Sequence, residues 1–251
     1  MKRVVDRVLV ARRRRQATLL SVAGLAVLGI GLFLNFQPSQ VLGAYVALLA
    51  GTLLSVLGIG LADKWLRRPR PEEALAEALK GGRALALYHW ALPAEHVLVA
   101  PWGLVVIAVF AQEGPVHVRG ARWREARPLW RALFSLGRRP VRDPSAALDA
   151  EAAALSAALV ADDPALAGVP IERLAVFTFP GVALTVDAPS RPAVRPADLR
   201  AWLRDASKRP ALPAADRRRL ELALDRLAEA RMTPAPPPKP RTARRGRARG
   251  G

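Results

Sequence analysis

Two long apolar segments lie back to back near the start of the chain. Residues 17–36 and 41–62 contain no charged side chain and are rich in Leu, Val, Ala and Gly. Because an α-helix rises about 1.5 Å per residue, roughly twenty residues cross the ~30 Å hydrocarbon core of a bilayer. The link at residues 37–40 is short and polar and contains Pro38, which favours a turn. The pattern predicts a transmembrane helical hairpin over residues 17–63.

Basic residues flank both ends of this hairpin. Arginines occupy residues 12–15, and Lys64, Arg67, Arg68 and Arg70 follow the second segment, whereas the link is uncharged. Lys and Arg beside membrane spans stay in the cytoplasm, so both termini are predicted to be cytoplasmic, with residues 1–16 as a basic N-terminus at the inner membrane of a bacterium. A cleaved signal peptide is the alternative, but its apolar region would be only about 7–15 residues long and would end at a cleavage site.

The second segment carries small side chains at every fourth position, namely Gly43, Ala47, Gly51 and Ser55. On a helix these residues form one stripe, which lets another backbone approach closely. The partner is either the first segment, which offers Gly24 and Gly31, or a second copy of the protein in a homodimer. Gly and Ala are also common throughout the chain, so composition alone is a third explanation.

Beyond residue 70 the apolar residues occur in shorter, periodic groups. Helical spacing predicts helices at 72–80, 143–160, 197–206 and 213–231, and apolar runs broken by Pro and Gly predict strands at 84–90, 97–100, 104–110, 116–119, 173–178 and 182–186. Asp143 is the expected N-cap of the second helix, followed by Pro144. The order predicts an α/β sandwich, a mixed sheet with flanking helices, over residues 71–206, followed by a C-terminal helix at 207–232.

The cysteine content limits the class of protein, and the net charge limits the class of binding partner. The chain has no cysteine and a formal net charge of +18, which excludes disulfide scaffolds and suggests an anionic partner such as lipid or nucleic acid. Residues 233–251 are rich in Pro and Arg and nearly devoid of apolar side chains. This tail is therefore predicted to be disordered, and its charge suits a lipid headgroup and a nucleic acid equally well.

Two further groups of residues are candidate binding sites. His89, His96 and His117 lie on or beside predicted strands without zinc-site spacing, so half-buried histidines and no metal are expected. The segment 119–142 interleaves aromatic residues with candidate nucleic-acid ligands, which are Arg122, Arg124, Arg127, Arg131, Arg138 and Arg139. Its alternative is an amphipathic face whose Trp130 and Phe134 cover the core.

Several stretches between residues 71 and 203 resemble one known family. They are Pro71-Glu72, Leu87-Tyr88-His89, Ala94-Glu95-His96 before an apolar strand, Gly103 to Ile107, Gln112-Glu113-Gly114, Asp143-Pro144 and Leu174 to Phe177. They are similar, in this order, to the motifs of the nuclease-related domain (NERD), which belongs to the restriction-endonuclease-like group. The resemblance implies a restriction-endonuclease-like α/β fold.

The chain departs from that family at its catalytic motif. The resemblance places Glu95 at the metal-binding Asp and Ala108-Val109-Phe110 at the Glu-x-Lys, while Glu72 matches an upstream helix acid. Ala and Phe cannot ligate Mg²⁺, which requires oxygen ligands. No catalytic residue and no cofactor are therefore expected, and Mg²⁺ would bind only if Glu72 or Glu113 supplied the missing carboxylate.

These observations predict a membrane-anchored, catalytically inactive pseudo-nuclease that binds nucleic acid at the cytoplasmic membrane face. The alternative is a membrane-proximal scaffold that binds a protein or anionic lipid, and an active metal-dependent nuclease is the third possibility. The position of the arginines discriminates between the first two. A basic cleft beside Glu95 and Ala108 would favour nucleic acid, and basic residues nearest the hairpin would favour lipid.

Overall fold

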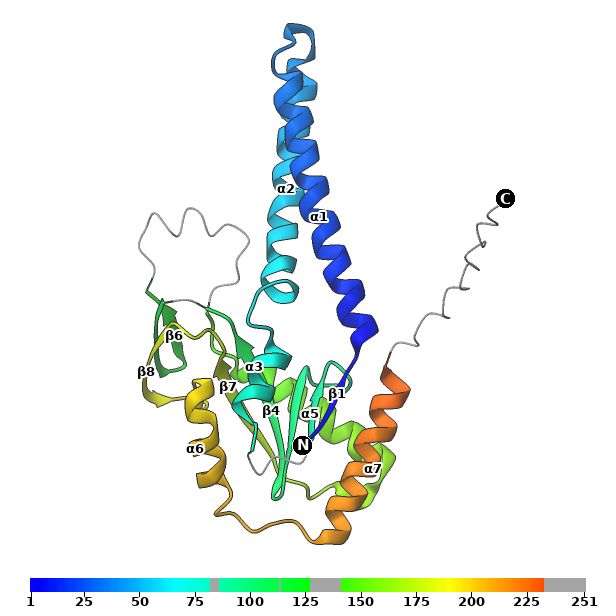
Figure 1. Cartoon of the computed structure of the whole chain (residues 1–251), viewed down its shortest axis with the longest axis vertical. Coiled ribbons are helices and arrows are strands. Elements are labelled where there is room, and N and C mark those ends of the chain that lie inside the picture. The colour runs from blue at the N-terminus through cyan, green and yellow to red at the C-terminus, as the bar shows by residue number, and fades with distance from the viewer. Residues whose placement is uncertain (82–85, 113, 127–140, 233–251) are drawn as a thin grey trace, which may run out of the picture.

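Two long antiparallel helices stand on an α/β domain (Figure 1). The structure is a computed structural model that describes residues 1–81, 86–112, 114–126 and 141–232. Helices α1 (Arg7–Leu34) and α2 (Val41–Trp65) form the hairpin, and a 3₁₀ turn at Pro38–Gln40 joins them. Helix α1 begins ten residues before the predicted span, because Asp6 caps it by accepting a hydrogen bond from the Leu9 backbone N–H (2.8 Å). The basic segment is thus a helical stalk continuous with the apolar part.

The hairpin packs through small residues spaced seven apart. The buried positions are Val10, Ala17, Gly24 and Gly31 on α1 and Ala44, Gly51, Gly58 and Trp65 on α2. A period of seven keeps a stripe facing a partner helix over many turns, whereas a strict spacing of four rotates away from it. Of the stripe predicted on α2, Gly51 lies against Leu28 and Ser55 lies against Gly24, so both contact α1 within the same chain. A homodimer through this stripe stays a prediction.

Gly24 offers a direct test of this packing. A Cβ atom at Gly24 would lie 2.6 Å from the Ser55 hydroxyl oxygen and 2.7 Å from its backbone nitrogen, whereas a Cβ at Gly29, on the same helix, would meet nothing within 4 Å. We expect Gly24→Leu to force the helices apart and to cost about 1–3 kcal/mol. Thermal unfolding of the full-length protein in detergent micelles should show a lower midpoint for Gly24→Leu and an unchanged one for Gly29→Leu. Equal midpoints for both variants would contradict this packing.

A six-stranded mixed sheet forms the centre of the domain, in the order β1-β2-β3-β4-β7-β9. Its strands are β1 (Lys2–Val5), β2 (Ala86–His89), β3 (His96–Ala100), β4 (Gly103–Phe110), β7 (Ile171–Phe177) and β9 (Ala193–Val194). Strands β2, β3 and β4 form an antiparallel meander, and β1, β7 and β9 pair in parallel with their neighbours. The predicted mixed sheet with flanking helices is confirmed.

Helices cover both faces of this sheet. On one face, α5 (Ser145–Asp162) and α7 (Ala214–Arg231) bury Tyr88, Val97 and Val106. On the other face, α3 (Pro71–Ala78) and α6 (Pro196–Ala206) bury the alternating positions Leu87, Leu98 and Val105. Such alternation is expected when both faces are covered, because successive strand residues point to opposite sides.

A second, three-stranded sheet lies beside the first, in the order β6-β5-β8. It consists of β5 (Gly114–Gly120), β6 (Arg122–Glu125) and β8 (Val182–Pro189). Val116, Val118 and Trp123 point inward and pack with Phe177 of β7. The sequence did not predict β6, because its alternation covers only four residues within an arginine-rich segment.

Other differences from the predicted elements include the unpredicted short strand β9, the longer strand β8, the start of helix α5 and the first residues of the chain. Helix α5 begins at Ser145, two residues after its predicted cap, yet Asp143 Oδ1 still accepts a hydrogen bond from the Ser145 backbone N–H (3.0 Å). Residues 2–5 were predicted as part of a basic N-terminal segment, and the structure places them in the sheet as β1, paired with β2. The predicted tail at 233–251 lies outside the described residues.

Candidate functional site

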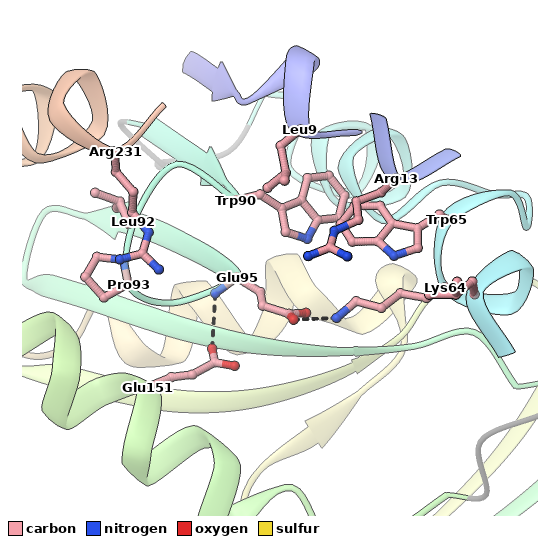
Figure 2. A pocket seen from close by; sticks show the side chains of 11 residues that line it. Leu9, Arg13, Lys64, Trp65, Trp90, Leu92, Pro93, Glu95, Glu151 and Arg231 are labelled. Atoms are coloured by element: carbon pink, nitrogen blue, oxygen red, sulfur yellow. Dashed lines mark hydrogen bonds and ion pairs between the residues drawn. The ribbon is translucent and has the colours of Figure 1, made fainter. Parts of the chain in front are cut away.

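A cavity of about 480 Å³ lies where the hairpin meets the domain (Figure 2). We call it the junction cavity. Helix α1 contributes Arg13, α2 contributes Lys64 and Trp65, and the turn between β2 and β3 contributes Trp90 and Glu95. The hairpin is held here by an apolar cluster of Val10, Trp65 and Trp90. Because both the hairpin and the domain supply its walls, the cavity exists only when the two are docked.

Glu95 connects three elements at the floor of this cavity. Its carboxylate forms an ion pair with Lys64 at the end of α2. Its backbone N–H donates a hydrogen bond to a carboxylate oxygen of Glu151 on α5 (3.2 Å). Burial raises the pKa of Glu151 above its ordinary value, and the nearby Glu95 charge adds to this effect, while the hydrogen bond and Lys64 oppose it. The arrangement fixes Glu95 in place between α2 and α5.

A second cavity of about 400 Å³ adjoins the first and shares Lys64, Trp90, Glu95 and Glu151 with it. We call it the strand cavity, because the end of β4 lines it with Ala108 and Phe110. The structure thus brings together Glu95, Ala108 and Phe110, three of the positions singled out by the nuclease-related resemblance. It does not bring Glu72 there, since Glu72 lies beneath α1 and forms an ion pair with Arg14 (2.9 Å). Glu113 lies outside the described residues.

In the strand cavity the two positions of the Glu-x-Lys motif supply no metal ligand. The side chains of Ala108 and Phe110 contain no oxygen, and the Glu95 carboxylate forms an ion pair with Lys64. Among the residues that the structure describes, no group of three His, Cys, Asp or Glu side chains is placed to hold a metal ion. Glu151 was missed by sequence reasoning, because it stands on an alanine-rich helix remote from Glu95 in the chain and no local motif marks it.

The histidines occupy two different environments. His89 and His96 face each other on β2 and β3, with their Nδ1 atoms 2.8 Å apart, and both are buried. Burial lowers the pKa of His89 to about 2 and that of His96 to about 3, and the positive charges of Arg3 and Lys64 respectively add to the effect. His117 is exposed on β5. The expected half-burial is therefore wrong for all three residues.

Of the predicted arginine ligands, the two that the structure describes, Arg122 and Arg124, line neither cavity. Arg122 and Arg124 are exposed on β6, opposite Arg119 and His117 of β5. The other four, Arg127, Arg131, Arg138 and Arg139, lie outside the described residues.

The ionisable residues of the strand cavity are mostly acidic, with Lys64 and Arg142 among Asp63, Glu95, Asp143 and Glu151. Around the base of the hairpin, by contrast, basic residues predominate, namely Arg3, Arg7, Arg12, Arg13, Arg14, Arg15 and Arg70.

No family model matches the chain, and no curated protein or solved structure matches it either. The site must therefore be interpreted from its own geometry and chemistry.

Proposed function

We propose that this chain is a two-span protein of the bacterial inner membrane, with both termini in the cytoplasm. In this proposal its α/β domain is a scaffold that is held against anionic lipid and does not cleave nucleic acids. The observation that carries the proposal is the distribution of charge: cations surround the base of the hairpin, whereas the strand cavity is mostly acidic. Cations near an anionic membrane surface are attracted with about 1 kcal/mol each.

The exposure of the hairpin supports its insertion in a bilayer. Both α1 and α2 are long and apolar enough to cross a membrane, and only 17% of the most apolar window of each helix is buried. Large side chains such as Leu25, Phe33 and Leu49 are more than half exposed. A core helix of a soluble protein would bury most of this surface, whereas lipid would cover it here.

The element order supports descent from a nuclease-related domain. Helix α3, the meander β2 to β4, helix α5 and strand β7 follow one another as the resemblance requires. The positions of the Glu-x-Lys motif, Ala108 and Phe110, line a cavity in which they offer neither a metal ligand nor a positive charge. We therefore propose an inactive member of the restriction-endonuclease-like group.

Nucleic-acid binding is a second candidate, and one observation favours it. The outer face of the small sheet carries His117, Arg119, Arg122 and Arg124 on adjacent strands. Such a group can bind successive phosphates through charge-assisted hydrogen bonds. It lies apart from the strand cavity, so binding at this face would be independent of the lost catalytic positions.

The experiment uses the full-length protein, because a fragment without residues 1–67 would lose strand β1 and the covering helix α1. Thermal unfolding in detergent micelles doped with phosphatidylglycerol or phosphatidylcholine measures the lipid preference. We expect phosphatidylglycerol to raise the unfolding midpoint relative to phosphatidylcholine, and added salt to reduce this difference. The double variant Arg12→Gln/Arg15→Gln should lose about 2 kcal/mol of the stabilisation by phosphatidylglycerol. In parallel, labelled DNA and RNA with Mg²⁺ should remain intact.

Two outcomes would overturn this proposal. Cleavage that Glu95→Ala abolishes would show an active nuclease. Equal stability in both lipids, together with salt-dependent DNA binding that Arg122→Glu/Arg124→Glu weakens, would favour the nucleic-acid candidate instead.

A further inference from the structure

We propose that the junction cavity binds the phosphate of one anionic phospholipid headgroup, with Arg13 and the indole N–H of Trp90 as its ligands. This inference rests on the proposed membrane insertion, which sets the depth of the cavity. The proposed function requires only a general attraction between basic residues and anionic lipid, whereas this inference assigns one lipid headgroup to one cavity. Figure 2 shows the Arg13 guanidinium and the Trp90 indole on one side of this cavity, with Glu95 and Lys64 at its floor.

The depth of the cavity matches the headgroup layer. Arg13 precedes the first residue of the apolar segment, Ala17, by four positions, or about 6 Å of helix, and Leu9 precedes it by about 12 Å. The polar layer on each side of a bilayer is roughly 5–8 Å thick, since the whole bilayer measures about 40–45 Å and its core about 30 Å. A headgroup of the adjacent leaflet therefore reaches the mouth of the cavity without leaving the membrane.

Trp90 supplies a buried donor that has no acceptor among the described residues. Its side chain is 9% exposed, and its Nε1 atom has no hydrogen-bond partner there. The ring is fixed, because its centroid lies 5.2 Å from that of Trp65 and 4.8 Å from that of His96. The residue itself adopts φ 55°, a left-handed conformation that a bulky side chain rarely takes, and its backbone N–H donates to the Glu95 carbonyl (2.7 Å). A fixed, buried N–H requires an acceptor, and a phosphate oxygen is one.

Two cations in the cavity are likewise without an anion. Lys64 is neutralised by Glu95, but Arg13 and Arg231 form no ion pair with any residue that the structure describes. They come from different elements and lie at different ends of the cavity, Arg13 from α1 beside Trp90 and Arg231 from the last turn of α7 beside Leu92 and Pro93 (Figure 2). A guanidinium presents a planar fork of donors that matches two phosphate oxygens, which makes arginine well suited to this ligand.

The apolar walls indicate a lipid rather than a free anion. Leu9, Leu61 and Leu92 line the same cavity, and Leu61 belongs to the second apolar segment, on the membrane side of Arg13. Inorganic phosphate would gain nothing from Leu61, whereas the glycerol backbone of a lipid would bury apolar surface against it. The combination of an unpaired guanidinium, one unpaired indole N–H and leucine walls fits an anionic amphiphile.

The test measures lipid retention by the full-length protein. The protein is placed in micelles containing phosphatidylglycerol, phosphatidylcholine, or inorganic phosphate alone, and native mass spectrometry counts the bound molecules. We expect one retained phosphatidylglycerol, with at least tenfold weaker retention in Arg13→Gln and in Trp90→Phe, which keeps the aromatic ring but removes the N–H. Arg12→Gln measures the diffuse attraction alone, since Arg12 is exposed on the same helix turn and does not line the cavity, and it should weaken retention much less than Arg13→Gln.

The outcomes separate this inference from the proposed function. If Arg12→Gln and Arg13→Gln weakened phosphatidylglycerol retention equally, and Trp90→Phe left retention unchanged, the defined site would be overturned. The diffuse attraction to anionic lipid would then remain as the explanation. Binding of inorganic phosphate without phosphatidylglycerol would overturn the lipid as its source. If phosphatidylglycerol and phosphatidylcholine were retained equally, both the site and the proposed lipid preference would fail. Arg13→Gln changes an exposed side chain, so its result holds even if Trp90→Phe unfolds the junction.

Discussion

Lowering the pH from 8 to 5 should reduce the free energy of unfolding by roughly 4 kcal/mol through the buried pair His89 and His96. The two rings share one contact between Nδ1 atoms at 2.8 Å, which requires that one neutral ring donates and the other accepts. Protonation of either ring would bury a positive charge, and protonation of both would place two Nδ1–H donors face to face. The charges nearest to the pair are Arg3 and Lys64, which are also positive.

The sign of this effect follows from the direction of the pKa shifts. In the unfolded chain each histidine has a pKa near 6.5, whereas in the folded state the pKa is about 2 for His89 and about 3 for His96. Below pH 6.5 the unfolded state therefore binds more protons, and stability falls as the pH falls. At pH 5 each ring contributes a loss of about 2 kcal/mol. The stability is complete above pH 6.5 and continues to decrease toward pH 3.

Chemical denaturation of the full-length protein in detergent, repeated between pH 8 and 5, measures this loss. The double variant His89→Leu/His96→Leu should have a flatter profile, because replacing both partners with apolar groups of similar size removes the titration without leaving an unpaired donor. His117→Gln, at an exposed position, should follow the wild type. Hydrogen bonding to Arg191 holds the pKa of Asp149 below its ordinary value, so that group stays ionised at pH 5. Parallel profiles for wild type and double variant would contradict the assigned role of the pair.

Arg14→Met should destabilise the protein by about 3–5 kcal/mol, because it leaves the Glu72 carboxylate buried without its partner. The Glu72 side chain is 8% exposed, and its Oε1 accepts a hydrogen bond from Arg14 (2.9 Å). Arg14 also donates to the backbone carbonyl of Trp65 (3.1 Å). The pair therefore joins α1, the end of α2 and α3 at a single point, where the hairpin is fixed to the domain.

A double-mutant cycle separates the pair from its surroundings. Removing both partners in Arg14→Met/Glu72→Met should restore much of the lost stability, since no charge then remains buried. Arg15→Met, at the exposed neighbouring position, should change the free energy of unfolding by less than about 0.5 kcal/mol. If the double variant were as unstable as the sum of the single ones, the two residues would not be coupled. Coupling would assign Glu72 a role in docking the hairpin rather than in metal binding.

The local pattern of residues was sufficient to predict most of the elements. The two apolar segments became α1 and α2, and the strands predicted at 84–90, 97–100 and 104–110 became β2, β3 and β4. These predictions succeed because the alternation or run of apolar residues reports which faces of one element are buried. The nuclease-related resemblance, rather than the apolar pattern, singled out Glu95, Ala108 and Phe110, which the structure brings to one cavity.

Predictions that depended on distant partners were less complete. Strand β1 is short and basic, and it is ordered as a strand only by pairing with β2, more than eighty residues away. Gly43 and Ala47 share the spacing of Gly51, yet the crossing of α1 and α2 buries Ala44 and Gly58 instead. The sequence pattern shows that small residues form a stripe, but only the geometry of the partner helix decides which of them face it.

The sequence by itself determined that this protein has two apolar helices, an α/β domain of strands with flanking helices, and no Glu-x-Lys motif at the end of β4. These properties depend on composition and on periodicity within one element. Only the tertiary structure decided that Lys64 and Glu151 meet at Glu95, that Glu72 pairs with Arg14, and that Arg13, Trp90 and Arg231 line one cavity. Such contacts depend on how separate elements pack, and a carboxylate or guanidinium leaves no periodic signal that would reveal its partner.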